Sequence, residues 1–417
     1  MGTYRIVGGA PLHGSVPIHG AKNSVLPILA ATLVTGGVCE LHNCPSISDV
    51  DDALELLRCL GCGTEQRGDT VRVDTAAATP RELPAALMKR MRAAVIFLGA
   101  MLTRFSHAEL SHPGGCPLGQ RPIDLHLRGL RLMGAECQYD GDALRCVTSG
   151  LHGCTLALPI PSVGATENLL LAALGCEGEV VICNAAKEPE IADLIGFLRV
   201  CGAEIVGDGT SVLRIVGKRP LHGAVYRILP DRMEAATYLA AAAATRGKLR
   251  LLDARAEHLD AVLRVLYRGG CRTETENGAL TVECQELKAV SPIITAPYDG
   301  FPTDAQAPVM AAMATAEGDS LFEETVFSDR FHHVPALCAM GANITTVKRH
   351  ALVRGVARLH GASVAATDLR GGAAMVIAAL GAQGESRVAQ TQHLERGYTA
   401  FAPILRDCGA EIISEGQ

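Results

Sequence analysis

The chain has 417 residues, which is too long for one ordinary hydrophobic core, so two domains of roughly 200 residues each are expected. Hydrophobic residues make up 48% of the sequence and charged residues 20%, which is typical of a globular protein and excludes a largely disordered chain. The net charge of −6 and the lack of a Lys/Arg run argue against a general nucleic-acid-binding surface, but a few convergent cations could still bind a small anion.

The N-terminal segment MGTYRIVGGAPLHG has no apolar run of signal-peptide length, and the apolar run at residues 238–245 is far too short to span a bilayer. The 15 cysteines are odd in number and scattered, without the density of a disulfide scaffold. These features predict a cytoplasmic protein with reduced thiols.

Taken in chain order, segments rich in Ala, Leu and Met predict buried helices at residues 23–33, 91–102, 166–174 and 233–244. Short strand-like segments follow glycine or polar turns at residues 37–43, 106–113, 178–185, 247–254, 318–325 and 384–391. A second helix then ends at a glycine, and a strand-like segment follows. The glycines that end these helices are Gly61, Gly134, Gly202, Gly270, Gly341 and Gly409, separated by 73, 68, 68, 71 and 68 residues.

Six near-equal steps indicate an internal repeat, and two domains then contain three repeated units each. Each repeat glycine fits the left-handed position that closes a helix C-terminus. Because the first helix of each unit is almost wholly apolar, it is expected inside its domain, with the sheets outside the helices. The sequence therefore predicts an α/β fold of an unusual, inside-out kind.

Charged residues recur where the first helices begin, and helix N-termini attract anions because their N–H groups are unpaired. At these starts stand Lys22-Asn23, Arg92, Thr166-Glu167, Arg232, Asp304 and Asp368 with Arg370; the loops that lead into second helices carry Cys116, Arg121, Lys187, Glu188, Arg330 and Arg396. A lone charge of this kind is usually a cap or a solvated group. Cations that recur at equivalent ends of several units suggest that two domains face each other across an anionic ligand.

The stretch SHPGGCPLGQRPIDLH, residues 111–126, sets one thiol among glycines and prolines. Gly114 and Gly115 permit backbone conformations closed to other residues, so the loop is suited to close over a site as a lid. A thiol near Arg121 would have a lowered pKa, which favours Cys116 as an acid or nucleophile. The alternative is a small apolar loop cysteine without a chemical role.

Other motifs are better explained by structure. The CLGC stretch at residues 59–62 has the spacing of a redox or zinc site, but it lies where other units have LMGA or VCGA, which favours core packing. His332-His333 lacks a carboxylate framework for a metal. GGAPLHG resembles neither a dinucleotide fingerprint nor a phosphate-binding P-loop.

The whole chain resembles the enolpyruvyl transferases, and among them the family that acts on UDP-N-acetylglucosamine and opens peptidoglycan precursor synthesis. The motifs that carry the resemblance are GAKNSVLPILAATL, PGGCPLGQRPIDLH, PSVGATEN, KEPEI, LPDRMEA, FPTDAQA, ETVFSDRF, ATDLR and ERGY. It implies two inside-out α/β barrel-like domains of three units each, comprising residues 22–229 and residues 1–21 plus 230–417. It also implies transfer of the enolpyruvyl group of phosphoenolpyruvate to the sugar 3-hydroxyl, with no cofactor and no metal.

The resemblance further implies roles for individual residues. Lys22, Arg121 and Arg396 would grip phosphoenolpyruvate, with Asn23, Arg92 and Arg370 nearby. Cys116 would be a proton donor that can be trapped as an adduct and is the target of fosfomycin, and Asp304 would accept the 3-hydroxyl proton. The UDP-sugar would contact Arg92, Arg121, Pro122, Ile123, Asp124, Leu125, Ile160, Pro161, Ser162, Val163, Asp304 and Val326. Asp231 and Asp368 also match site positions of the family.

Two positions depart from the family pattern. Ile160 stands where some members have a lysine, so a side-chain salt bridge to the diphosphate is not expected here, and Pro117 follows the cysteine. The alternatives are 5-enolpyruvylshikimate-3-phosphate synthase, disfavoured by the cysteine loop and RPIDLH, and a catalytically idle binding paralogue. The combined presence of Lys22, Cys116, Asp304 and Arg396 disfavours the idle paralogue. A monomer that binds small molecules, with no nucleic-acid or membrane partner, is expected.

Overall fold

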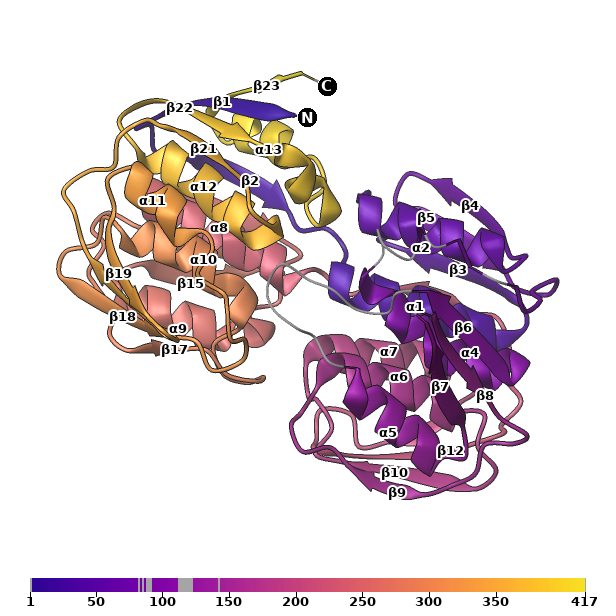
Figure 1. Ribbon diagram of the computed structural model, residues 1–417. Helices are drawn as coiled ribbons and strands as arrows, with labels where there is room; N and C mark the ends of the chain where they lie inside the picture. Colours follow the sequence, from indigo (N-terminus) through magenta and orange to yellow (C-terminus); the bar gives the residue numbers. More distant parts are fainter. Residues whose placement is uncertain are drawn as a thin grey trace. The chain divides into compact units, whose positions relative to one another are not determined.

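The computed structural model describes residues 2–416 except 82, 85, 88–91, 112–122 and 142; the side chains of Arg92, Ala93 and Ser111 are also outside the description. The described chain divides into two compact units (Figure 1). The first unit contains residues 20–111 and 123–229. The second unit contains residues 2–19 and 230–416.

Three nearly fully buried helices form the centre of the first unit: α1 (Lys22–Thr35), α4 (Phe97–Phe105) and α6 (Val163–Ala173). A short 3₁₀ helix, η1 (Arg92–Ile96), precedes α4. Almost every residue of α1 after Asn23 is buried, as expected for a helix that is apolar on all sides. The amphipathic helices that lie further out are α2 (Ser48–Cys59), α5 (Asp124–Leu132) and α7 (Pro189–Val200).

Three open sheets surround these helices. Their strand orders are β13-β3-β5-β4, β6-β8-β7 and β11-β12-β10-β9. Buried and exposed residues alternate along most of the strands, so one face of each sheet packs on the core and the other faces water. The strands are β3 (Val38–His42), β4 (Gly63–Arg67), β5 (Thr70–Asp74), β6 (His107–Ser111), β7 (Glu136–Asp140), β8 (Ala143–Val147), β9 (Thr155–Ala157), β10 (Glu179–Cys183), β11 (Glu204–Val206), β12 (Val212–Val216) and β13 (Val225–Arg227).

The second unit repeats this plan. Its central helices α8 (Arg232–Thr245), α10 (Thr303–Met313) and α12 (Leu369–Gly381) pack on one another, and each is buried along nearly its whole length. The alanine run in α8 keeps side chains short, which suits close packing of helices. The outer elements are η2 (Ala256–His258), α9 (Asp260–Arg268), α11 (Val334–Ala339), η3 (Thr391–Arg396) and α13 (Phe401–Asp407).

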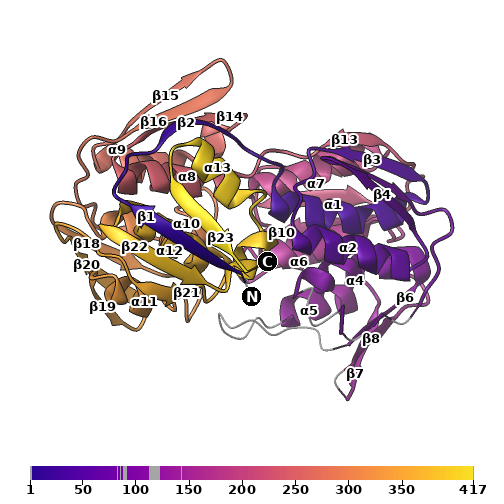
Figure 2. The same ribbon diagram turned by 90° about the horizontal axis from the view of Figure 1, so that it is seen from above.

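The three sheets of the second unit have the strand orders β15-β16-β14-β2, β17-β18-β20-β19 and β21-β22-β1-β23. Two of them take strands from the first residues of the chain: β2 pairs in parallel with β14, and β1 lies between β22 and β23, antiparallel to both (Figures 1 and 2). The strands are β1 (Thr3–Gly8), β2 (His13–Pro17), β14 (Lys248–Leu252), β15 (Arg272–Glu276), β16 (Ala279–Glu283), β17 (Ile293–Ile294), β18 (Asp319–Glu323), β19 (Asn343–Val347), β20 (His350–Arg354), β21 (Ser363–Ala365), β22 (Gly384–Ala389) and β23 (Glu411–Glu415).

The α/β class predicted from the sequence is confirmed, and all sheets of the described chain are open rather than closed on themselves. The six repeat glycines have φ between 87° and 101°, which confirms that each needs a left-handed backbone. The structure also explains the recurring Leu-His-Gly turns. A Cβ built at Gly341 would lie 2.6 Å from His360 Nδ1, and one at Gly134 would lie 2.9 Å from His152 Cδ2, so these histidines cover the repeat glycines of their units.

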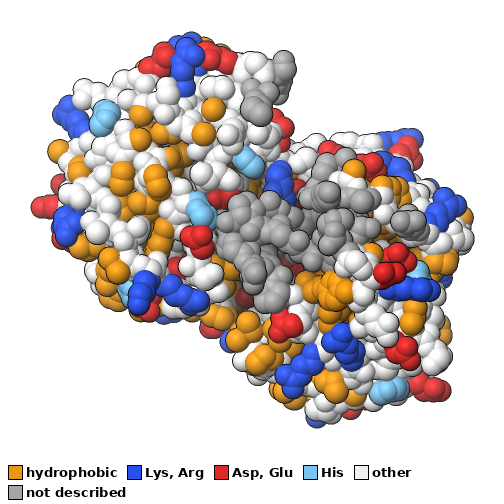
Figure 3. Space-filling model, in the orientation of Figure 1, with side chains coloured by type: hydrophobic (Ala, Val, Ile, Leu, Met, Phe, Trp, Pro, Cys, Tyr) orange, Lys and Arg blue, Asp and Glu red, His pale blue; other side chains and the backbone are white. Residues whose placement is uncertain are grey.

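Two findings concern what the described residues lack. None of their helices is long and apolar enough to cross a membrane. They also contain no group of three or more His, Cys, Asp or Glu side chains arranged to hold a metal ion. Figure 3 shows Lys and Arg side chains interspersed with Asp and Glu on the visible faces.

Candidate active site

Acidic residues stand at the N-termini of the three central helices of the second unit. Asp231 caps α8 by accepting hydrogen bonds from the amides of Met233 at 2.6 Å and Glu234 at 3.1 Å. Asp368 caps α12 by accepting from the amides of Arg370 and Gly371, at 3.0 and 3.1 Å. Both caps satisfy N–H groups that a helix start leaves unpaired.

Asp304, in the first turn of α10, joins two of these elements. Its Oδ1 lies 2.6 Å from Arg330 Nη2, and its Oδ2 accepts a hydrogen bond from Arg370 Nε at 3.1 Å. The two arginine side chains are only 5% and 4% exposed, whereas that of Asp304 is 30% exposed. The carboxylate is therefore held by two buried arginines and is still partly exposed to solvent. A group that contacts a substrate needs this exposure.

The Arg370 guanidinium is held from its other side by Tyr398. Arg370 Nη1 donates to the phenolic oxygen at 2.9 Å, and that hydroxyl shares a 2.8 Å hydrogen bond with Thr237 Oγ1. Burial opposes the positive charge, but Tyr398, Asp304 and Asp231 outweigh it, so the pKa of Arg370 is raised. The side chain is a permanent cation in a fixed orientation.

Two further arginines lie at element ends in the second unit. Arg396 is the last residue of η3 and is partly exposed. Gly397 follows it, and a Cβ there would lie 2.6 Å from Leu369 Cδ2, so a larger residue would require the Leu369 side chain at the start of α12 to move. Arg232 begins α8 with its guanidinium 5.2 Å from the centre of the Tyr298 ring.

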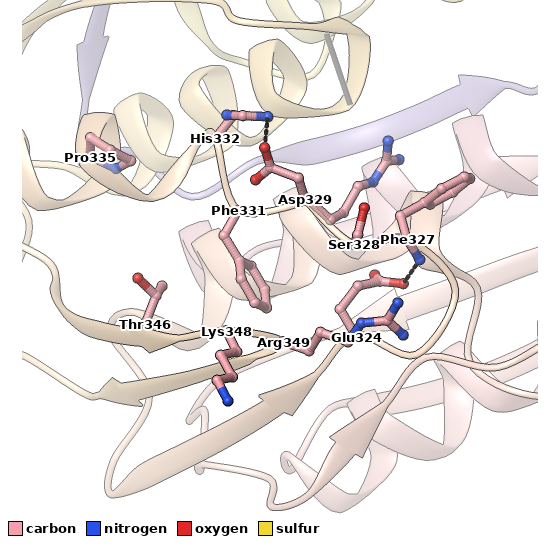
Figure 4. Close-up of a pocket in the computed structure, with 11 residues that line it drawn as sticks. Glu324, Phe327, Ser328, Asp329, Phe331, His332, Pro335, Thr346, Lys348 and Arg349 are labelled. Carbon is pink, nitrogen blue, oxygen red and sulfur yellow. Dashed lines mark hydrogen bonds and ion pairs between the residues drawn. The ribbon is translucent and has the colours of Figure 1, made fainter. Parts of the chain in front are cut away.

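Val326 lies in the loop after β18 and is 41% exposed. This loop borders a pocket of about 250 Å³ whose lining includes Phe327, Arg330, Phe331 and Lys348 (Figure 4). The pocket and the Asp304 cluster share Arg330, so they are neighbours within the second unit.

In the first unit, Lys22 begins α1, and its Nζ lies 2.6 Å from Asp49 Oδ2 near the start of α2. Asn23 beside it is exposed. The hydroxyl of Ser24 hydrogen-bonds to Asp193, which also accepts from Tyr226 at 2.7 Å. These contacts fix the beginning of α1 and, with it, the lysine.

The segment from Ile160 to Ser162 leads into α6, which begins at Val163. Ser162 caps the helix by accepting from the amide of Ala165 at 3.4 Å, and Ile160 is 60% exposed. Ile123, Asp124 and Leu125 stand at the start of α5, with Asp124 exposed.

Some predicted site residues lie outside the description. Cys116, Arg121 and Pro122 fall within residues 112–122, as does the predicted glycine-rich lid. For Arg92 the backbone alone is described, at the start of η1.

A buried histidine that the sequence did not single out connects three helices of the first unit. His126 Nδ1 accepts a 2.9 Å hydrogen bond from Asn168 Nδ2, and Asn168 Oδ1 accepts the amide of Gly99 at 2.6 Å. Burial lowers the pKa of His126 to about 4. This neutral imidazole fixes α5, α6 and α4 to one another. Its place at the end of the RPIDLH stretch was the available signal.

Comparison with known proteins identifies the class to which this fold and this cluster belong. Residues 6–405 match the family model of EPSP synthase (3-phosphoshikimate 1-carboxyvinyltransferase). The enolpyruvyl transferase NikO from Streptomyces tendae superposes with a TM-score of 0.91 at 27% identity, covering 99% of this chain and 98% of that one. An EPSP synthase from Acinetobacter baumannii, with a TM-score of 0.74, 19% identity and full coverage of both chains, shares the fold. The class is that of the enolpyruvyl transferases.

Curated relatives narrow this class. The UDP-N-acetylglucosamine 1-carboxyvinyltransferase 2 of Caldanaerobacter subterraneus subsp. tengcongensis is 45% identical over 414 residues, covering 99% of both chains. The UDP-N-acetylglucosamine 1-carboxyvinyltransferase of Oleidesulfovibrio alaskensis is 45% identical over 407 residues, covering 98% of both. The chain belongs to the UDP-N-acetylglucosamine 1-carboxyvinyltransferase family.

Proposed function

We propose that the chain transfers the enolpyruvyl group of phosphoenolpyruvate to the 3-hydroxyl of UDP-N-acetylglucosamine and releases phosphate, the first committed step of peptidoglycan precursor synthesis. The observation that carries this proposal is the 45% identity to enzymes named for that reaction, over 99% of both chains. The acid–arginine cluster around Asp304 supports it, because the reaction needs both a base and anion-binding groups.

The reaction is an addition followed by an elimination. The sugar O3 bonds to C2 of phosphoenolpyruvate while C3 gains a proton, which gives a tetrahedral phosphate ketal. C3 then loses a proton, the C2–O bond to phosphate breaks, and the enolpyruvyl ether and phosphate leave. A sugar hydroxyl is a poor nucleophile, so a base must take its proton. We assign this role to Asp304, whose carboxylate is partly exposed and oriented by Arg330 and Arg370.

The ion pairs of Asp304 suggest that phosphoenolpyruvate binds before Asp304 accepts the hydroxyl proton. A carboxylate paired with two guanidiniums is a weaker proton acceptor than a free one. Phosphoenolpyruvate carries a carboxylate and a phosphate, and both suit the planar guanidinium of Arg370. The arriving substrate then competes with Asp304 for that guanidinium and leaves the carboxylate freer to accept a proton.

The other assignments follow the family resemblance. Phosphoenolpyruvate is bound by Lys22, Asn23, Arg92, Arg121, Arg370 and Arg396. The sugar nucleotide is bound by Arg92, Arg121, Pro122, Ile123, Asp124, Leu125, Ile160, Pro161, Ser162, Val163, Asp304 and Val326. Cys116 delivers the proton to C3 and is the residue that forms adducts. Because Ile160 offers no charge, the diphosphate is held there by the N–H groups at the start of α6.

We also propose that the functional domains are residues 22–229 and residues 1–21 plus 230–417, each an inside-out, barrel-like arrangement of three units. The burial of α8, α10 and α12, with sheets that expose one face to water, supports this description. A cytoplasmic location and a monomeric state stay predictions.

The test is phosphate release with purified protein and phosphoenolpyruvate, using UDP-N-acetylglucosamine in one assay and shikimate 3-phosphate in another. Phosphate release in the assay with UDP-N-acetylglucosamine, and not in the assay with shikimate 3-phosphate, supports the proposal. Release with shikimate 3-phosphate would identify a shikimate enzyme, and binding of the sugar nucleotide without release would identify an idle paralogue.

A further inference from the structure

Glu324 is a buried carboxylate with an unusual number of hydrogen bonds. It follows β18 directly and is 1% exposed. Its oxygens accept from five donors: Thr295 Oγ1 at 3.0 Å, Val326 N at 2.8 Å, Phe327 N at 2.9 Å, Thr303 Oγ1 at 2.8 Å and Gln306 Nε2 at 3.0 Å. No ion pair to Glu324 occurs within the described part of the chain, so these hydrogen bonds are the contacts that satisfy its buried oxygens.

The two oxygens serve different elements. Oε2 binds Thr303 and Gln306, which flank Asp304 in the first turns of α10. Oε1 binds the amides of Val326 and Phe327 in the loop after β18. Figure 4 shows the bond from the Phe327 amide to the Glu324 carboxylate at the edge of the pocket. One side chain thus links the helix that carries the proposed base to the loop that carries a proposed sugar contact.

Neighbouring contacts make this link rigid. Thr295 donates to Glu324 and accepts the amide of Thr325 at 2.9 Å. The hairpin turn between β19 and β20 holds the same loop, because Arg349 Nη1 donates to the carbonyl of Thr325 at 3.1 Å and the Arg349 carbonyl accepts the Glu324 amide at 2.8 Å. A shift of the carboxylate therefore moves both α10 and the loop.

We propose that Glu324 is a positioning residue of the enolpyruvyl transfer: it sets the place of Asp304 relative to the Val326 loop without touching substrate. This inference rests on the proposed function, which makes Asp304 the base and Val326 a sugar contact. The position of Asp304 matters because a general base must lie within hydrogen-bond reach of the hydroxyl proton, and a displacement of about 1 Å can lower the rate roughly 100-fold.

Glu324→Gln separates positioning from folding, because the site tolerates an amide in one orientation. The amides of Val326 and Phe327 are fixed donors, so the Gln oxygen must take the place of Oε1. Its NH₂ group then faces Thr303, whose hydroxyl can rotate, and Gln306, whose amide can flip. Gln306 Oε1 is buried without a hydrogen-bond partner, so a flip gives it one. The substitution therefore changes the hydrogen bonds at Thr303 and Gln306, which flank Asp304, and preserves the hydrogen bonds to the amides of Val326 and Phe327 in the loop.

Ser320→Ala is the matched control. Ser320 lies on β18, the strand that Glu324 follows, is 1% exposed, and accepts the amide of Val290 at 3.1 Å. The substitution removes this one buried hydrogen bond, which involves neither Asp304 nor Val326. Thr295→Val is the complementary variant, because it loosens the loop side of Glu324 while the acid itself is kept.

Steady-state kinetics and denaturant unfolding of the full chain test the proposal. We expect Glu324→Gln to lower kcat about tenfold with KM for UDP-N-acetylglucosamine within about twofold, and Thr295→Val to raise that KM at least threefold with kcat nearly kept. Ser320→Ala should change neither. If Glu324→Gln keeps the kcat of Ser320→Ala, whether or not it is less stable, Glu324 does not position the base and the proposal is overturned. Failure of the unaltered protein to release phosphate would refute the proposed function instead.

Discussion

The carboxylate of Asp304 accepts a hydrogen bond from the guanidinium of Arg370 at 3.1 Å, inside the second unit. Arg330 takes the other oxygen, and Tyr398 holds the far edge of Arg370. The proposed base and a proposed phosphoenolpyruvate ligand are thus one hydrogen-bonded assembly. Changes at one of them are expected to appear in the function of the other.

Replacing Asp304 by Ala should abolish turnover and leave sugar-nucleotide binding largely intact, because the base is lost while the other contacts remain. It also removes the carboxylate partner of two buried guanidiniums, of which Arg370 keeps its hydrogen bond to Tyr398, at a cost of up to about 3–5 kcal/mol in stability. Asp304→Asn is the control that keeps an acceptor for one arginine. Phosphate release and calorimetric titration with UDP-N-acetylglucosamine measure the two effects; substantial turnover by both variants would show that Asp304 is not the base.

Tyr398→Phe should weaken phosphoenolpyruvate binding about five- to tenfold, since one hydrogen bond to a charged group is removed and Arg370 loses its orientation. Tyr238→Phe provides a matched control, because that hydroxyl is also fully buried but has no hydrogen-bond partner. KM for each substrate is the measurement. An equal effect of the two variants on KM would show that Tyr398 does not orient Arg370 for phosphoenolpyruvate binding.

Arg396→Ala should weaken phosphoenolpyruvate binding by about 10- to 100-fold, the loss expected for a charge-assisted contact worth roughly 1.5–3 kcal/mol. Arg406→Ala removes the same charge from an exposed position on α13 and should have little effect. Titration with phosphoenolpyruvate compares them. An unchanged affinity of the Arg396 variant would exclude that residue from the site.

Cys116→Asp should keep some turnover, because a carboxylic acid can still deliver a proton, but should lose inactivation by fosfomycin. Mass spectrometry after exposure to fosfomycin or phosphoenolpyruvate locates any adduct. Full sensitivity of the variant would show that another residue is the target.

The low pKa of the buried His126 leads us to expect that the protein loses stability in mild acid. Its pKa is about 4 in the folded protein because of burial, against an ordinary value of 6.5. Between these values the unfolded chain binds a proton that the folded chain does not, so stability falls as the pH drops from 6.5 toward 4, by at most about 1.4 kcal/mol per pH unit. Denaturant unfolding of the unaltered protein and of His126→Gln should show a shallower pH dependence in the variant. His13→Gln, at an exposed position, is the control; equal slopes for all three proteins would contradict the prediction.

The repeat could be predicted because it rests on local signals. Helix C-terminal glycines, such as Gly61 and Gly341, need a left-handed backbone, and that need is visible in the sequence. The sheet order could not be predicted. β1 pairs with strands that begin at Gly384 and Glu411, and no local pattern specifies partners that far along the chain.

The site was predictable to a similar, limited degree. Asp304 and Arg370 stood out as charges at helix starts, and they lie in contact. Their roles came from the family resemblance and stay proposals. Tyr398 and Glu324 were missed because their importance lies in tertiary hydrogen bonds. Nothing in the sequence Phe-Glu-Glu-Thr shows that Glu323 is partly exposed while Glu324 is enclosed by five donors.

The pairing of β1 and β2 with strands that lie more than 200 residues further along the chain also bears on synthesis. As the polypeptide leaves the ribosome, residues 3–17 emerge well before β14, β22 and β23, which begin at residues 248, 384 and 411. The first unit can therefore complete its core while those early residues still wait without partners. A fragment that begins at residue 230 would lack two strands of its own sheets, and we expect it to need residues 2–19, supplied as a peptide, to fold.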